Sequence, residues 1–299
     1  MFETYRRKVD LLIKVIPFVK EAGCFALHGG TAINLFVRDM PRLSVDIDLT
    51  YMPIEDRETS LRKIEEALNA IKTRIESLIP GVQVQHKQDI GKLLILFQEL
   101  DVKLEVNLVG RGVIGDVQDR ALCQKAQSDF EAFTTIPVVP LAQLYGGKIC
   151  AALDRQHPRD LFDVKYLLEN EGFSDDIRKG FIYCLLGSDR PIHEVIFPNF
   201  QDQRSALATQ FSGMSDEEFT YEVYETVRER LIKVVNEQLT ASDKAFLLSF
   251  KNAEPDWTIY DFERFPSIQW KLRNLNTLKK NNPSKHQQQY DQLKEKLGI

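Results

Sequence analysis

The sequence feature that most constrains the fold is a segment near residue 45 in which apolar and polar residues alternate strictly. Its apolar positions are Leu43, Val45, Ile47 and Leu49, and its polar positions are Arg42, Ser44, Asp46 and Asp48. Because successive side chains of a β-strand point to opposite faces, this pattern predicts a half-buried strand with one polar face.

The two aspartates of this strand are the first candidates for chemistry. Asp46 and Asp48 leave the same face and lie about 7 Å apart at Cα. Two carboxylates this close repel each other unless a cation lies between them, and hard oxygen ligands suit Mg²⁺. The pair therefore predicts a magnesium site; the alternative is two solvated aspartates on an exposed strand.

A glycine pair lies just upstream of that strand. The short apolar run from Cys24 to His28 is followed by Gly29-Gly30-Thr31 and then by apolar residues at helical spacing. This order predicts a strand, a tight turn and a helix. Glycines allow a phosphate to approach the backbone, and a helix N-terminus favours negative charge. Together with the aspartates, the turn predicts a site for the triphosphate of an NTP, and Arg42 and Ser44 extend its polar face.

A third carboxylate is expected on another strand. In the segment 101–110 the residues Asp101, Lys103, Glu105 and Asn107 form a polar face. Glu105 is our choice, because it lies mid-strand between apolar residues. Asp101 is the second candidate, and the alternative is that Glu105 is only an edge-strand charge opposite Lys103 or another neighbour.

The remaining pattern indicates an α+β protein in two parts. Residues 1–138 are predicted to form a mixed sheet flanked by helices, and residues 139–299 a helical domain. Pro140 and Pro158 stand where first-turn prolines belong, and Ser215 to Glu218 resembles a capping box. The elements expected from periodicity are helices at 3–22, 55–78 and 216–239, and strands at 82–87, 92–98 and 101–110.

Composition narrows the class of protein. No apolar run approaches the length of about 18 residues that a membrane-spanning helix needs, so we expect no membrane association. The cysteines occur singly, which argues against a zinc knuckle and a disulfide framework and favours the cytoplasm. They are Cys24, Cys123, Cys150 and Cys184.

Charge is distributed unevenly along the chain. The net charge is −5, yet the last 29 residues, from Lys271 onward, carry seven basic and two acidic residues. This basic segment is either a phosphate-binding surface or an ordinary solvated helix end. Trp257 and Trp270 are expected in the helical core rather than as a platform for stacking bases.

The segment HGGTAINLFVRDMPRLSVDIDL resembles the first motif of the AbiEii/AbiGii-type toxin family, a branch of the polymerase-β-like nucleotidyltransferases. The spacer between Gly30 and Asp46 is slightly longer than in the broader superfamily, where Gly-Ser is also commoner than Gly-Gly. A second block, GGKICAALDRQHPRDLFDVKYLL, is similar to the next motif of the family. It contains Lys148, Ala152, Arg155, Arg159, Asp160 and Asp163.

The resemblance implies a role for each matching residue. Gly30 and Thr31 would hold the β- and γ-phosphates, and Asp46 and Asp48 would bind two Mg²⁺ ions. Glu105 would bind one ion and act as the base. In the second block, Lys148 would reach the triphosphate, and Asp163 would orient it or contact the nucleotide, with Arg155 and Asp160 beside them. For Arg159 and Asp163, four residues apart, the alternative is a simple surface ion pair.

The function expected from this resemblance is transfer of an NMP from an NTP to an acceptor hydroxyl. The acceptor would be RNA, such as the 3′ end of tRNA, and the protein would be a toxin with a cognate antitoxin. Two alternatives keep the metal site and change the acceptor to an aminoglycoside-like small molecule or to a protein hydroxyl. A third alternative is a non-catalytic family member that acts as a binding protein.

Overall fold

The computed structural model describes residues 2–299, which form two compact units. Unit 1 consists of the chain up to Pro140 together with Thr209–Glu218. Unit 2 consists of Leu141–Ala208 and Phe219–Ile299, and every regular element described in it is a helix. The sequence did not predict that a segment as late as Thr209–Glu218 returns to the first unit.

Unit 1 is built on a seven-stranded mixed sheet with the order β3-β4-β5-β2-β1-β7-β6. The strand β2 lies in its middle, antiparallel to β1 and parallel to β5. The strands are β1 (Phe25–His28), β2 (Asp46–Tyr51), β3 (Val82–Lys87), β4 (Lys92–Phe97), β5 (Leu100–Val106), β6 (Gln118–Ala121) and β7 (Thr135–Val138).

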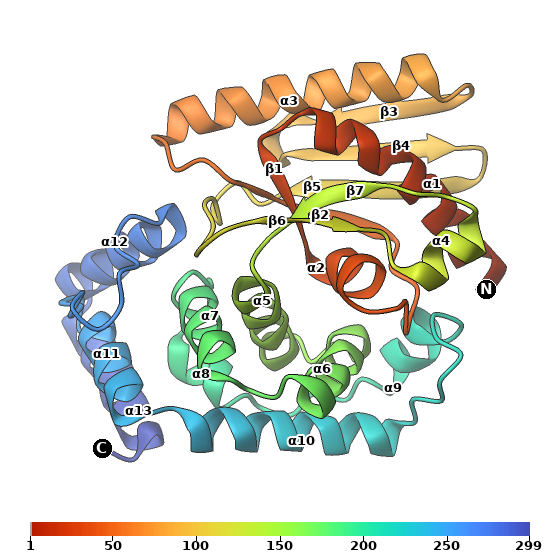
Figure 1. Cartoon of the computed structure of the whole chain (residues 1–299). Helices are drawn as coiled ribbons and strands as arrows, with labels where there is room; N and C mark the ends of the chain where they lie inside the picture. Colours follow the sequence, from red (N-terminus) through yellow and green to blue (C-terminus); the bar gives the residue numbers. More distant parts are fainter. Residues whose placement is uncertain (1) are drawn as a thin grey trace. The chain divides into compact units, whose positions relative to one another are not determined.

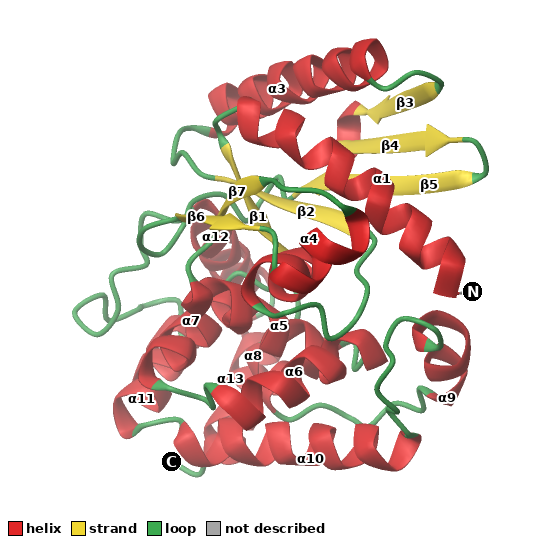
Figure 2. Cartoon of the chain, turned by 45° about the vertical axis from the view of Figure 1, so that its right-hand side comes forward, coloured by secondary structure: helices red, strands yellow, loops and turns green. Residues whose placement is uncertain are grey.

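Long amphipathic helices cover this sheet. α1 (Phe2–Glu21) packs on β5 and β7, and α3 (Arg57–Leu78) packs on β3 and β4 (Figure 2). α1 buries an apolar stripe that includes Leu12, Ile16 and Val19. The remaining helical segments of unit 1 are α2 (Gly29–Thr31), the π-helical η1 (Ala32–Val37), the 3₁₀ turn η2 (Gln88–Ile90) and α4 (Gln124–Phe130).

Unit 2 is centred on α5 (Leu141–Asp154) and α7 (Asp175–Leu186), which pack against each other (Figure 1). Two glycines allow this approach: a Cβ on Gly146 would lie 2.3 Å from the carbonyl carbon of Gly180, and one on Gly180 would lie 1.9 Å from the Ala142 oxygen. The other helices include α6 (Pro158–Asn170), α8 (Ile192–Ile196), α10 (Tyr221–Gln238), α11 (Ala241–Lys251), α12 (Pro266–Asn281) and α13 (Pro283–Leu297). Two short pieces, α9 (Arg204–Ala206) and the π-helical η3 (Leu207–Phe211), precede α10, and η3 begins as the chain returns to unit 1.

The predicted fold class is confirmed. The α+β arrangement, the two long helices of unit 1 and the three strands after residue 80 all lie within a few residues of the expected positions. Pro158 is the first residue of α6, as predicted. The strands β6 and β7 and the helix α4, which lie between residues 111 and 139, carry no strong periodicity and were missed.

Three local predictions are wrong. The alternating strand begins at Asp46, so Arg42 and Ser44 precede it and are buried. The capping box at Ser215 does not form, because α10 begins at Tyr221 and Thr220 caps it instead. Trp270 is 47% exposed rather than part of the core, since it lies on the outer face of α12.

Candidate functional site

The first two residues of α2, directly after β1, are glycines because no side chain fits at either position. Gly29 has a φ of +71°, and a Cβ placed on it would lie 2.1 Å from Oδ2 of Asp48. A Cβ on Gly30 would lie 2.7 Å from Nη2 of Arg42 and 2.9 Å from Oγ of Ser44. The glycine pair therefore lets the backbone lie directly against the side chains that the sequence predicted for the site.

Asp46 and Asp48 are the first and third residues of β2, the middle strand of the sheet. Both side chains are partly exposed, while Ile47 between them is fully buried. Asp48 is the register partner of His28 in β1 and of Glu105 in β5. The strand therefore presents two carboxylates on one face, as the alternation predicted.

Thr31 is fully buried, and its hydroxyl donates to the backbone oxygen of Asp46 at 2.5 Å. The same hydroxyl lies 3.0 Å from Oγ of Ser44. The side chain of Thr31 thus ties the start of β2 to the glycine turn. Its predicted contact with phosphates stays a prediction.

Arg42 and Ser44 are 3% and 7% exposed, and both face Gly30. Nη1 of Arg42 donates to the carbonyl of Leu43 at 2.9 Å. This places a guanidinium and a hydroxyl beside the glycine turn from the loop before β2, instead of from the strand itself.

The segment Thr209–Glu218 of unit 1, which the sequence did not place near this loop, holds it. The backbone N–H of Leu43 donates to the Met214 carbonyl at 2.6 Å, and Oγ of Ser215 donates to the Pro41 carbonyl at 2.9 Å. The apolar residues Phe211 and Met214, which are buried, could have indicated that this segment packs in a core. Periodicity alone, however, cannot show that it contacts a loop so distant in sequence.

The two candidates for the third carboxylate have different partners. Glu105 lies beside Asp48 by register and forms an ion pair with Lys92 of β4. Asp101 forms an ion pair with Lys8 of α1 at 2.7 Å, and this contact holds its pKa below the usual value. Register therefore favours Glu105. Within residues 2–299 no group of three or more His, Cys, Asp or Glu side chains is arranged to hold a metal ion, so the third ligand stays a prediction.

The second motif forms a buried charge network in unit 2. Nζ of Lys148 lies 2.9 Å from Oδ1 of Asp160 and 2.9 Å from Oδ2 of Asp163. Arg155 grips the same Asp160 carboxylate in a bidentate pair, with Nε at 2.6 Å and Nη2 at 3.0 Å. Burial alone would raise the pKa of the Asp160 carboxyl, but Lys148 and Arg155 outweigh burial and hold that pKa well below its ordinary value.

This network changes the interpretation of three residues. Lys148 is 7% exposed and already neutralises two aspartates, so it is a buried charge and not a solvent-facing one. Asp163 forms an ion pair with Lys148. The sequence spacing had suggested only a pair between Asp163 and Arg159. Arg155, whose side chain is 59% exposed, is the member of the network that meets solvent.

The model of one protein family, the nucleotidyl transferase AbiEii toxin of type IV toxin–antitoxin systems, matches residues 10–274. The chain belongs to the AbiEii family. It is therefore a nucleotidyltransferase toxin of a type IV toxin–antitoxin system, and this family implies an NTP substrate and an antitoxin partner.

Among solved structures, the AbiEii chain is similar to MenT4, a nucleotidyltransferase toxin from Mycobacterium tuberculosis H37Rv. The TM-score is 0.62 and the sequence identity 14%, over 91% of this chain and 93% of that chain. At this identity the likeness supports the fold. No curated protein matches the chain.

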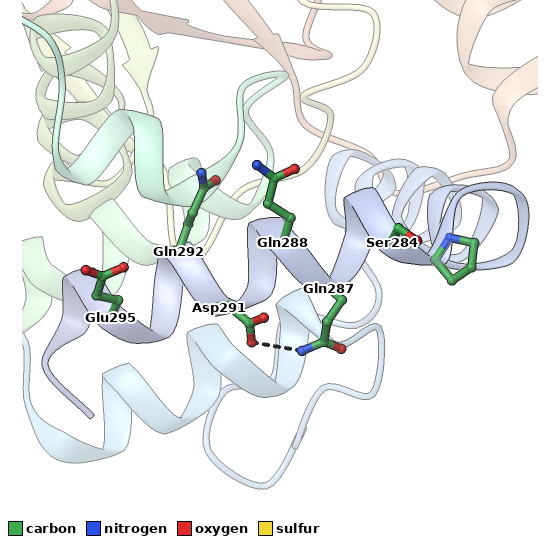
Figure 3. Close-up of a pocket in the computed structure, with 7 residues that line it drawn as sticks. Ser284, Gln287, Gln288, Asp291, Gln292 and Glu295 are labelled. Carbon is green, nitrogen blue, oxygen red and sulfur yellow. Dashed lines mark hydrogen bonds between the residues drawn. The ribbon is translucent and has the colours of Figure 1, made fainter.

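Two further features of the AbiEii chain concern its helices. None of the helices in residues 2–299 is long and apolar enough to cross a membrane. A hollow of about 710 Å³ lies along α13 and is lined by polar side chains such as Gln287, Gln288 and Asp291 (Figure 3). No basic residue lines it, so it does not suit a triphosphate.

Proposed function

We propose that this AbiEii nucleotidyltransferase transfers an NMP from an NTP to a hydroxyl of RNA, such as the 3′ end of tRNA, with Mg²⁺ held by Asp46 and Asp48. The observation that carries the proposal is the close approach of Gly29 to Asp48. A backbone turn without side chains beside a carboxylate pair is the arrangement that a metal-bound triphosphate requires.

The donor set fits magnesium. Both aspartates are partly exposed and offer hard oxygen ligands. The missing Cβ of Gly29 leaves room for the Asp48 carboxylate. Two bound Mg²⁺ ions would neutralise the triphosphate and activate the acceptor hydroxyl. Glu105, the register neighbour of Asp48, would be the further ligand.

The chain's own residues account for the rest of the step. The acceptor oxygen forms a bond to the α-phosphorus, the bond from that phosphorus to the bridging oxygen of the β-phosphate breaks, and pyrophosphate leaves. The hydroxyl proton passes to the carboxylate of Glu105. The backbone of Gly30, with Arg42 beside it, would hold the β- and γ-phosphates, and Thr31 positions Asp46 through its hydrogen bond.

The basic helix α12 supports an RNA acceptor. Residues 266–281 contain four basic residues and no acidic residue, in a chain whose net charge is −5. Lys279 pairs with Glu254 at 3.0 Å, and Lys271 donates to two backbone carbonyls. The exposed Arg273 and Lys280 suit the phosphates of a polyanionic acceptor better than a small molecule. We therefore assign the chemistry to residues 1–138 and acceptor binding to residues 139–299, in a protein of the cytoplasm.

One experiment tests the acceptor and the metal together. The purified chain is incubated with Mg²⁺, total cellular RNA and each α-labelled NTP in turn, and the labelled species are resolved by size. Label on tRNA that requires Mg²⁺ and disappears with Asp46→Ala supports the proposal. Label on a protein or on a small molecule, with none on RNA, would replace the proposed acceptor.

A further inference from the structure

Two lysines of unit 2, the buried Lys251 and the half-buried Lys271, hold their ammonium groups on neutral oxygen atoms. Lys251, the last residue of α11, is 2% exposed, and its Nζ donates to Oε1 of Gln289 at 2.6 Å. Nζ of Lys271 in α12 donates to the backbone carbonyls of Ser188 and of Arg190, the latter at 2.5 Å. Within residues 2–299 neither ammonium has a carboxylate within 4.0 Å. Burial of an unpaired charge is costly, so its presence calls for a reason.

Lys271 lines a hollow of about 160 Å³ between α12 and the turn that follows α7. An ammonium has three N–H donors, and the carbonyls of Ser188 and Arg190 account for two of them. Gln289, which accepts a hydrogen bond from Lys251, lines the same hollow, so Lys251 is one hydrogen bond away from its lining. Burial lowers the pKa of both lysines to about 8, and each therefore gains from a bound anion.

The rim of the hollow carries an aromatic platform. Trp270 lines the hollow and is 47% exposed, so its indole ring is accessible for stacking. Asn274, one turn further along α12, adds an amide. At about 160 Å³ the hollow is smaller than the roughly 300 Å³ of a small-molecule site, so it suits one phosphate while the attached base stays outside.

We propose that this hollow, the α12 pocket, binds one unpaired nucleotide of an RNA acceptor, with Lys271 on the phosphate and Trp270 stacked on the base. The proposal rests on the proposed function, since it names where the RNA acceptor is held. Sequence-tolerant binding of single strands commonly combines a cationic groove with aromatic stacking.

Two features favour RNA over an acidic protein segment. A second hollow of about 370 Å³ on the same helix is lined by Arg273 and Lys280, so the positive charge continues along α12 as a phosphate backbone would require. An acidic peptide would pair with the ammonium groups but would leave Trp270 exposed. Asp189, an exposed acid, also lines the pocket. Its negative charge repels a bound phosphate, so removing that charge should strengthen RNA binding.

The test measures binding of a short fluorescent single-stranded oligoribonucleotide to the full chain, without NTP. Trp270→Ala and Lys271→Gln should each weaken binding by roughly tenfold. Asp189→Asn should tighten it. Lys233→Gln, which removes an exposed lysine of α10, is the matched control and should lower affinity much less. Trp270 is exposed, so its variant tests the pocket even where a lysine variant fails to fold. Quenching of tryptophan fluorescence by RNA should also disappear in Trp270→Phe, which leaves Trp257.

Three outcomes would overturn the proposal. The first is equal RNA affinity for the wild type, Trp270→Ala and Lys271→Gln. The second is competition by poly-glutamate with no binding of RNA, which would indicate an acidic protein partner. The third is binding of inorganic phosphate alone. RNA labelling from NTP is measured in parallel: labelled RNA with unaffected pocket variants rejects only the α12 pocket, whereas the absence of labelled RNA rejects the proposed acceptor.

Discussion

A Cβ atom on Gly29 would lie 2.1 Å from the carboxylate oxygen Oδ2 of Asp48. No side chain can occupy that position without moving the aspartate. The backbone at Gly29 also has a φ of +71°, which side-chain-bearing residues rarely adopt. The glycine turn and the aspartate strand are therefore a single structural unit, and a change to either disturbs both.

Replacing Gly29 with Ala should abolish transfer, because the new methyl group displaces Asp48. Gly23→Ala is the matched control: Gly23 belongs to the same unit and has a φ of +68°, but no atom lies within 4 Å of its Cβ position. Both variants should lose about 1–2 kcal/mol of stability from the backbone conformation alone. Labelled transfer and urea unfolding together check this. Equal activity of the two variants would mean that the contact with Asp48 is irrelevant to function.

Lys148→Ala should destabilise the protein by about 3–5 kcal/mol, because Asp160 and Asp163 lose their shared buried cation. Lys148→Arg should retain more stability, although a planar fork replaces a point charge. If Lys148 also contacts the triphosphate, the KM for NTP will rise in Lys148→Arg at a temperature where the variant is folded. Thermal unfolding and steady-state kinetics on the same samples separate the two roles. An unchanged KM would leave Lys148 a structural residue.

Stability should rise between about pH 8 and pH 10.5 because of Lys251. Burial lowers its pKa to about 8 in the folded protein, against an ordinary value of 10.5. Across that window the unfolded chain binds more protons than the folded one, so the free energy of unfolding increases with pH. Lys251→Met should be more stable at pH 7 by about 1–3 kcal/mol. Its stability should rise less over this window, because only Lys271, whose pKa is also lowered to about 8, still contributes. The difference in urea midpoint between wild type and variant, measured at pH 7 and 9.5, checks the sign; a difference that does not shrink at pH 9.5 would contradict it.

Two substitutions of a carboxylate by its amide, Glu105→Gln and Asp101→Asn, can identify the third metal-binding carboxylate. Glu105→Gln should reduce transfer by at least about 100-fold, since register places Glu105 beside Asp48 and a general base contributes at least this much. Asp101→Asn should change it little, because the Asp101 carboxylate is paired with Lys8. Transfer rates at saturating NTP and Mg²⁺ decide between them. The reverse ranking would move the role to Asp101.

Much of this architecture could be predicted from local patterns. The alternation around Ile47 correctly placed Asp46 and Asp48 on one face, because strand geometry dictates it. The glycine pair correctly marked the turn. The predictions that failed depend on contacts distant in sequence: Arg42 is buried because Gly30 and the Met214 segment enclose its loop. The acid partners of Lys148 were likewise invisible, since helix packing and not spacing brings Asp160 and Asp163 to it.

The central claim is that Asp46 and Asp48 hold the metal ions of a nucleotidyltransferase that acts on RNA. Its most direct test is the rate at which α-labelled NMP enters RNA for the wild type, Asp46→Ala and Asp48→Ala, with Mg²⁺ present and folding checked by circular dichroism. Each variant should lose about 10³-fold or more in rate, because metal stabilisation contributes several kcal/mol to the transition state. Each should also be slightly more stable than the metal-free wild type, since the repulsion between the two carboxylates is removed. A folded variant that labels RNA at the wild-type rate would contradict the account.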